Sequence, residues 1–106
     1  MIQGIAKKRP VDIHFFKWDN CRLNKLFEWI RGFGEKPESH IQAHTYQAPG
    51  SGELLHKISV NILEGGSYEV PSGYIIIRGV QGEYYPCEPN IFNKTYEIIE
   101  NEEKQQ

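Results

Sequence analysis

One apolar stripe constrains this chain more than any other feature of its sequence. Four apolar residues stand three or four positions apart, as on one face of an amphipathic helix: Leu23, Leu26, Phe27 and Ile30. Asp19 and Asn20 precede the stripe as suitable N-caps, and Gly32 and Gly34 follow it as helix stops. A helix of about twelve residues is marginal alone in water. The stripe must therefore pack on a sheet, where burial of these side chains contributes on the order of 6–12 kcal/mol before entropy is subtracted.

The strands of that sheet are predicted on both sides of the helix. Residues 11–18 alternate apolar and polar side chains, and residues 54–62 repeat this period over a longer stretch. Residues 74–78 form an apolar run that ends at Arg78, which indicates a central strand buried on both faces. Shorter strands are predicted at 41–45, 68–70 and 83–87, and a short helical turn is predicted at 89–96. We expect an α+β fold: an antiparallel sheet (β-meander) with one main amphipathic helix packed on it and a short C-terminal helical turn.

The length and the termini set the expected domain organisation. The chain has 106 residues, which fits one domain. We expect an N-terminal arm over residues 1–10, a single α+β domain over 11–99 and a polar tail over 100–106. The sequence has no run of about 18 apolar residues typical of a membrane span. The basic cluster at residues 7–9 follows apolar residues, the opposite order to a secretory signal, so we expect a cytoplasmic protein.

The segment from Gly73 to Glu97 resembles a known family. The residues that carry the likeness are Ile76-Ile77-Arg78-Gly79-Val80, Gly82-Glu83, Tyr85-Pro86-Cys87, Pro89, Ile91-Phe92 and Thr95-Tyr96-Glu97. They are similar to the C-terminal motif of small uncharacterised proteins of tailed bacteriophages and prophages. Tyr74 and Asn90 stand where that motif usually has aspartate. The resemblance implies a viral origin and a small accessory protein in the host cytoplasm, and it implies no catalytic site.

Two residues of this segment are candidates for chemistry. The Glu83 carboxylate is expected to accept N–H groups of its turn or to pair with Arg78, and a general base or a ligand contact is the alternative. Cys87 precedes the short C-terminal helical turn, whose N–H groups could activate a thiolate. It is expected to be a packed thiol, and a nucleophile paired with a histidine is the alternative. Cys21 and Cys87 form no C-x-x-C motif, so both are expected to be free thiols in a reducing compartment.

Histidines and basic residues suggest two further kinds of site. His40 and His44 have the i, i+4 spacing of helical metal ligands, but their surroundings read as extended, so we predict a solvated loop, no metal and no cofactor. The basic cluster Lys7, Lys8 and Arg9 could contact phosphates. A small nucleic-acid-associated protein is therefore the alternative function, although a net charge of −2 argues against a protein that coats nucleic acid.

Aromatic residues make up 12% of the chain, and several fall outside the expected buried positions. Such residues mark a binding interface or, alternatively, fill a second core on the other face of the sheet. We expect a non-catalytic binding protein, acting in counter-defence or host takeover on a host protein or a small molecule, with homo-oligomerisation left open. The predicted contact surface is the hairpin around residues 84–85 together with a loop at 34–53. The predicted binding residues are Trp18, Arg78, Glu83, Tyr84, Tyr85, Phe92 and Tyr96.

Overall fold

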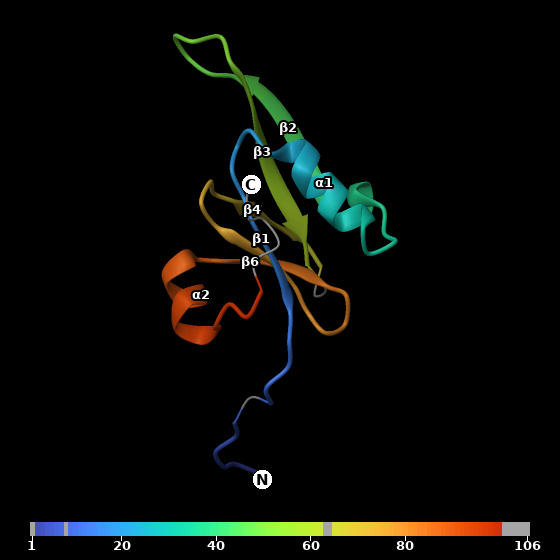
Figure 1. Cartoon of the computed structure of the whole chain (residues 1–106), viewed down its shortest axis with the longest axis vertical. Coiled ribbons are helices and arrows are strands. Elements are labelled where there is room, and N and C mark those ends of the chain that lie inside the picture. Colours follow the sequence, from blue (N-terminus) through green and yellow to red (C-terminus); the bar gives the residue numbers. More distant parts are fainter. Residues whose placement is uncertain (1, 8, 63–64, 101–106) are drawn as a thin grey trace.

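The computed structural model of the chain describes residues 2–7, 9–62 and 65–100 (Figure 1). Its elements, in chain order, are β1 (His14–Lys17), α1 (Leu23–Arg31), the 3-10 helix η1 (Pro37–Ser39), β2 (Ile41–Gln47), β3 (Leu54–Asn61), β4 (Ser67–Val70), β5 (Ile75–Arg78), β6 (Tyr84–Cys87) and α2 (Pro89–Thr95). One longer helix, antiparallel strands and a short C-terminal helix confirm the predicted α+β fold. Among the elements described, no helix is long and apolar enough to cross a membrane.

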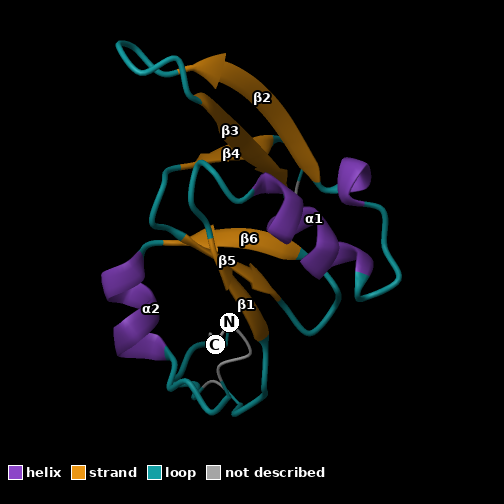
Figure 2. Ribbon diagram, turned by 45° about the horizontal axis from the view of Figure 1, so that its top comes forward, coloured by secondary structure: helices purple, strands orange, loops and turns teal. Residues whose placement is uncertain are grey.

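The strands divide into two three-stranded antiparallel sheets, where a single meander was expected (Figure 2). One sheet has the order β1-β5-β6 and the other the order β2-β3-β4. The division falls after β4, at Pro71 and Gly73. Pro71 has no N–H to donate to a ladder, and Gly73 has a φ of 94°, which side chains rarely tolerate. The Gly73 N–H then donates to the Trp18 carbonyl at 2.8 Å, which brings the next strand alongside β1.

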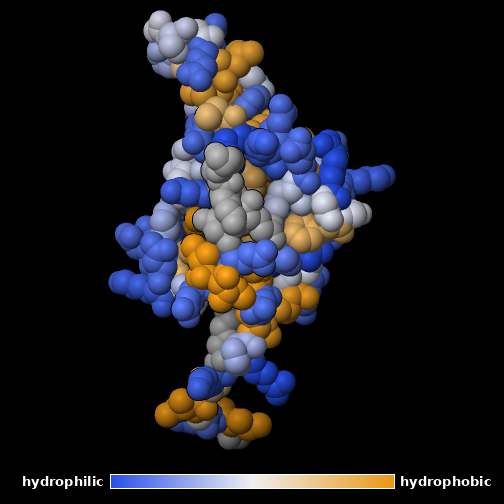
Figure 3. All heavy atoms as spheres, viewed as in Figure 1, coloured by the Kyte–Doolittle hydropathy of each residue, from blue (hydrophilic) through white to orange (hydrophobic). Residues whose placement is uncertain are grey.

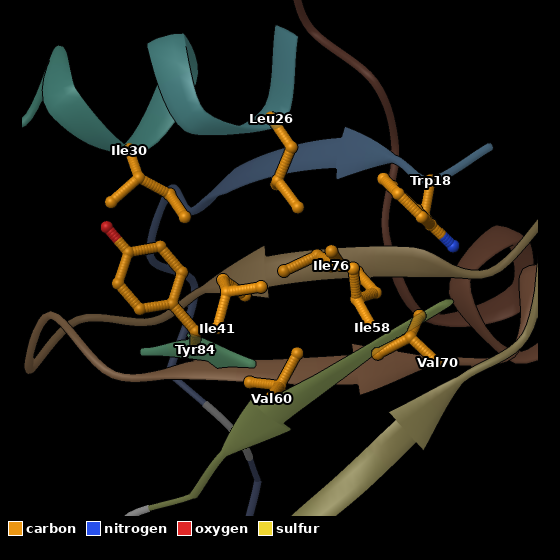
Figure 4. Packing of buried hydrophobic residues seen from close by; sticks show 9 residues of the cluster. All are labelled: Trp18, Leu26, Ile30, Ile41, Ile58, Val60, Val70, Ile76 and Tyr84. Atoms are coloured by element: carbon orange, nitrogen blue, oxygen red, sulfur yellow. The ribbon is translucent and has the colours of Figure 1, made fainter. Parts of the chain in front are cut away.

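The main core lies between α1 and the two sheets (Figure 4). Leu26 and Ile30 point from α1 toward the sheets and are fully buried, which confirms the predicted apolar stripe. The helix begins later than the predicted caps, because Asp19 Oδ1 accepts the Cys21 backbone N–H at 3.0 Å in the preceding turn. The buried cluster consists of Trp18, Leu26, Ile30, Ile41, Ile58, Val60, Val70, Ile76 and Tyr84.

A second, smaller core lies on the opposite face of sheet β1-β5-β6. Ile75, Ile77 and Phe92 are buried in it, and the partly buried side chains that pack against it are Ile13, Phe15, Tyr85, Cys87 and Tyr96. Strand β5 thus supplies Ile76 to the main core and its two neighbours to the second core, which confirms the prediction of a central strand buried on both faces. The Glu88 side chain caps α2 by accepting the Ile91 N–H at 3.1 Å.

Residues 34–53 do not form the single loop that was expected. They contain η1, β2 and a turn at 48–53, and β2 with β3 forms a hairpin that projects from the body (Figure 1). Asn20 fastens this hairpin to the turn before α1, because its side chain donates to the Tyr46 hydroxyl at 2.9 Å and its carbonyl accepts the His56 N–H at 3.0 Å. The sequence predicts only a short strand at 41–45 within this segment, whereas the second strand of the hairpin, β3, corresponds to the strand predicted at 54–62.

Candidate functional site

Four side chains from distant parts of the sequence meet where the segment after α1 reaches the β5–β6 hairpin. The Tyr84 hydroxyl donates to Glu35 Oε1 at 2.6 Å, across 49 positions of sequence. Arg78 Nη2 lies 3.4 Å from Glu35 Oε2, and Arg78 Nε donates to the Tyr84 oxygen at 3.2 Å. His40 Nε2 lies 3.7 Å from Glu35 Oε1. We call these four residues the Glu35 cluster.

Aromatic rings hold the members of the Glu35 cluster in place. The guanidinium carbon of Arg78 lies 4.3 Å from the centroid of the Phe33 ring. The His40 and Tyr84 ring centroids are 4.6 Å apart. The side chains of Arg78 and Glu35 are 22% and 29% exposed, so their ion pair sits at the rim of the main core. The cluster therefore fastens the connection between α1 and β2 to the β5–β6 hairpin.

These contacts also shift the pKa values of Tyr84 and Glu35. Burial, followed by the hydrogen bond to Glu35, raises the pKa of Tyr84 to about 12. The hydrogen bond from Tyr84, with help from Arg78, holds the pKa of Glu35 below its ordinary value. A phenol that keeps its proton at neutral pH is a poor general base, and the charge of Glu35 already has a partner. Across the residues that the structure describes, every buried side-chain nitrogen or oxygen has a hydrogen-bond partner, so no buried polar atom awaits a ligand.

The Glu83 carboxylate forms a hydrogen bond within its own turn. Its Oε1 accepts the Gln81 N–H at 2.9 Å, as one of the two structural interpretations had it. The other interpretation, an ion pair with Arg78, is wrong because Arg78 pairs with Glu35. The carboxylate of Glu83 lies over Gly79, where an added Cβ would overlap it.

Sequence patterns gave no hint of Glu35, since it lies in a Gly/Pro-rich segment without periodicity.

The predicted aromatic contact residues lie mostly in the two cores. Trp18 and Tyr84 are 1% exposed and Phe92 is 2% exposed, so their side chains offer almost no surface to a partner. Tyr85 packs on the second core with Tyr96, their hydroxyls 3.5 Å apart. Successive strand residues point to opposite faces, which sends the two tyrosines of the hairpin into different cores. The aromatic residues are therefore divided between the two cores: Trp18, Trp29 and Tyr84 lie in or against the main core, and Tyr85, Phe92 and Tyr96 lie in or against the second.

The residues considered for nucleophilic or metal chemistry are scattered. Cys87 packs against the second core. His40 belongs to the Glu35 cluster, His56 Nδ1 lies 3.0 Å from the Thr45 hydroxyl, and His44 is exposed on β2. Within the described ranges, no group of three or more His, Cys, Asp or Glu side chains is placed to hold a metal ion.

The open edge of β1 is a different kind of feature, and the sequence gave no direct signal for it. In sheet β1-β5-β6, strand β1 has a neighbouring strand on one side only. Along an antiparallel strand, the backbone groups of alternate residues point toward the neighbouring strand. The Trp18 N–H donates to the Tyr74 carbonyl at 2.8 Å, so the backbone groups of Phe16 and His14 also point toward β5. The N–H and C=O groups of Phe15 and Lys17 consequently point away from the sheet.

A groove of about 1210 Å³ runs along this open edge. Its floor is β1 with residues 10–13, one wall is the outer face of α1, and the other wall is the end of α2 with residues 96–100. Ring contacts tie the floor to both walls: the Phe16 and Trp29 centroids are 5.5 Å apart, and the Phe15 and Phe92 centroids are 5.1 Å apart. We call this hollow the β1 groove.

The two walls of the β1 groove differ in charge. The α1 wall carries Arg22 and Lys25 beside the single carboxylate of Glu28, whereas the C-terminal wall carries Glu97 and Glu100. Apolar surface is also available there, because Val11, Ile98 and Ile99 are 49%, 50% and 75% exposed. The groove thus combines outward-pointing backbone groups, aromatic rings, exposed aliphatic side chains and walls of unlike charge.

The basic residues of the arm lie apart from the Glu35 cluster. Lys7 and Arg9 are exposed in an extended segment that precedes β1, and Lys8 falls outside the described residues. In Figure 1 this arm leads away from the body of the molecule.

Comparison of the chain with protein-family models, with curated proteins and with solved structures finds no match.

Proposed function

We propose that this chain is a small non-catalytic binding protein that takes an extended segment of a partner protein as an added strand on β1. The open edge of β1, with the outward backbone groups of Phe15 and Lys17, carries the proposal. Proteins usually pair, cover or blunt such edges. An added strand supplies the missing partners, and each main-chain hydrogen bond contributes about 0.5–1.5 kcal/mol net.

The groove walls specify the chemistry of the bound segment. Side chains of an added strand alternate between the two walls. One wall carries Lys25, and the other carries Glu97 and Glu100. A fitting segment is therefore extended, apolar at its centre, acidic toward α1 and basic toward the C-terminal wall.

The partner in this proposal is a host protein. The likeness of residues 73–97 to small phage proteins supports an accessory role in the cytoplasm of an infected cell, in counter-defence or host takeover. The state of the Glu35 cluster supports a role without catalysis, since Tyr84 keeps its proton and Glu35 is already paired with Arg78.

A display library of random peptides, selected on the immobilised chain, tests the proposal. Binding of the selected peptides is then compared between Lys17→Ala and Lys17→Pro. Both variants remove the charge, but only proline removes the N–H that points out of the sheet. We expect the alanine variant to bind like the parent chain and the proline variant to lose binding at least tenfold, with the selected peptides perturbing the NMR signals of the Phe15 and Lys17 amides.

Two outcomes contradict the proposal. Peptides that bind the proline variant as well as the alanine variant would use another surface. If no peptide is selected, and the chain is instead retained on a DNA column with steep salt dependence that Lys7→Ala and Arg9→Ala abolish, the nucleic-acid-associated function is favoured.

A further inference from the structure

The N-terminal arm exposes apolar side chains that no other described residue covers. Ile2 and Ile5 are 98% and 104% exposed, the largest values among the exposed apolar residues. Figure 3 shows apolar atoms at the far end of the arm, separated from the body of the molecule. Single exposed aliphatic residues are ordinary on a folded surface, but two on an extended segment with no packing partner indicate a segment made for contact with another molecule.

The arm is also placed so that it leaves its own groove open. It continues β1 in the direction away from the sheet, so residues 2–7 do not line the β1 groove of the same chain (Figure 1). A two-fold rotation about an axis near the start of β1 would lay each arm along the β1 edge of the other copy. Such an exchange is closed and self-complementary, which is the usual geometry of homodimers.

The charge of the arm matches the C-terminal wall of the groove. In an extended conformation, Gln3, Ile5 and Lys7 share one side of the arm, and the opposite side carries only uncharged residues. Lys7 is the one charged residue within residues 2–7, and the C-terminal wall of the groove carries Glu97 and Glu100. Ile5, on the same side as Lys7, would meet the exposed aliphatic surface of Ile98 and Ile99 on that wall.

We infer that the β1 groove is occupied by residues 2–7 of a second copy of this chain, in a dimer with exchanged arms. The inference rests on the proposed function in one respect, because both use the open edge of β1. It goes further by naming the occupant, and it makes the arm a competitor that a partner segment must displace. In this dimer, the backbone groups of Phe15 and Lys17 form hydrogen bonds with the arm of the other copy, and Ile2 and Ile5 are removed from solvent.

Sedimentation velocity of the full chain over a wide range of concentration tests this inference. We expect a species of twice the 12.3 kDa chain mass. The double variant Ile2→Glu with Ile5→Glu should sediment as a monomer, and its fold is safe because both positions are fully exposed. The matched control, Gly4→Glu with Ala6→Glu, adds the same charge on the side of the arm away from Glu97 and Glu100 and keeps both isoleucines, so it should dimerise within about tenfold of the parent chain.

A second measurement places the arm at the edge itself. In the dimer, the amides of Phe15 and Lys17 should exchange with solvent at least tenfold more slowly than in the monomeric double variant. Lys17→Pro should also dissociate the dimer, whereas Lys17→Ala should not. A parent chain that is monomeric at every concentration overturns the inference, as does a dimer that survives the Ile2 and Ile5 substitutions.

The same variants separate this inference from the proposed function. If the parent chain is monomeric but selected peptides still distinguish Lys17→Ala from Lys17→Pro, the binding function stands and the arm exchange falls. If the arm-dependent dimer forms but the monomeric double variant binds no peptide, the arm exchange stands and the binding of a foreign segment falls.

Discussion

The Tyr84 hydroxyl forms two of the hydrogen bonds of the Glu35 cluster. It donates to Glu35 Oε1 at 2.6 Å and accepts from Arg78 Nε at 3.2 Å, while its ring fills the main core. Tyr84→Phe keeps the ring and removes both hydrogen bonds. We expect the free energy of unfolding to fall by about 1–3 kcal/mol, because a charge-assisted bond is lost. Urea denaturation followed by tryptophan fluorescence measures the change.

The chain offers a matched control for this substitution. The Tyr85 hydroxyl lies on the other face of the hairpin, 3.5 Å from the Tyr96 hydroxyl, which is a weak contact. Tyr85→Phe should therefore change the free energy of unfolding by no more than about 0.5 kcal/mol. Equal losses in the two variants would show that the Glu35 cluster contributes nothing particular to stability.

The cost of Tyr84→Phe should also depend on pH. The folded-state pKa of Glu35 lies below the ordinary value of 4.5, so just below pH 4.5 the unfolded chain binds more protons than the folded chain. The stabilisation from the charged carboxylate is therefore complete above pH 4.5 and is lost as the pH falls through the folded-state value. The difference between the parent chain and Tyr84→Phe should shrink over that range.

At the scale of elements, the β5–β6 turn depends on one close approach. The Glu83 carboxylate lies over Gly79 and accepts the Gln81 N–H at 2.9 Å. Gly79→Ala would push the carboxylate aside and break that hydrogen bond, and Glu83→Ala would remove the bond directly. We expect each change to cost about 0.5–1.5 kcal/mol. The double variant should cost no more than the larger single change, because both act on the same contact.

A double-mutant cycle by thermal or urea unfolding checks this coupling. Full additivity would mean that Gly79→Ala acts through the backbone of the turn and not through Glu83. A useful reference is Gly4→Ala in the arm, where an added Cβ meets nothing within 4 Å.

The elements that could be predicted from sequence are those whose signal is local. The helical spacing of the α1 stripe and the continuous apolar run of β5 are both local patterns, and both predictions are confirmed. The Glu35 cluster could not be predicted, because Glu35 lies in a segment without periodicity, and its partners Arg78 and Tyr84 lie 43 and 49 positions away. The open edge of β1 was hidden for a similar reason, since it depends on the division of the strands into two sheets.

At the scale of the whole molecule, two cores share one strand. Ile76 of β5 faces the main core, and Ile75 and Ile77 face the second core under α2. A side chain removed from the second core should therefore loosen β5 and with it the main core. Both tryptophans belong to the main core or pack against it, so their fluorescence reports on the core that is not mutated.

Phe92→Ala tests this coupling, because Phe92 is 2% exposed in the second core and contacts the Phe15 ring. If the chain unfolds as one unit, the transition seen by tryptophan fluorescence should lose about 3–5 kcal/mol and coincide with the transition seen by far-ultraviolet circular dichroism. An unchanged fluorescence transition preceded by a partial loss of circular dichroism would mean that the two cores unfold separately. The β1 groove would then have the lower local stability, since Phe92 lines it as well as the second core. Its capacity to hold a strand would vary with the stability of the second core.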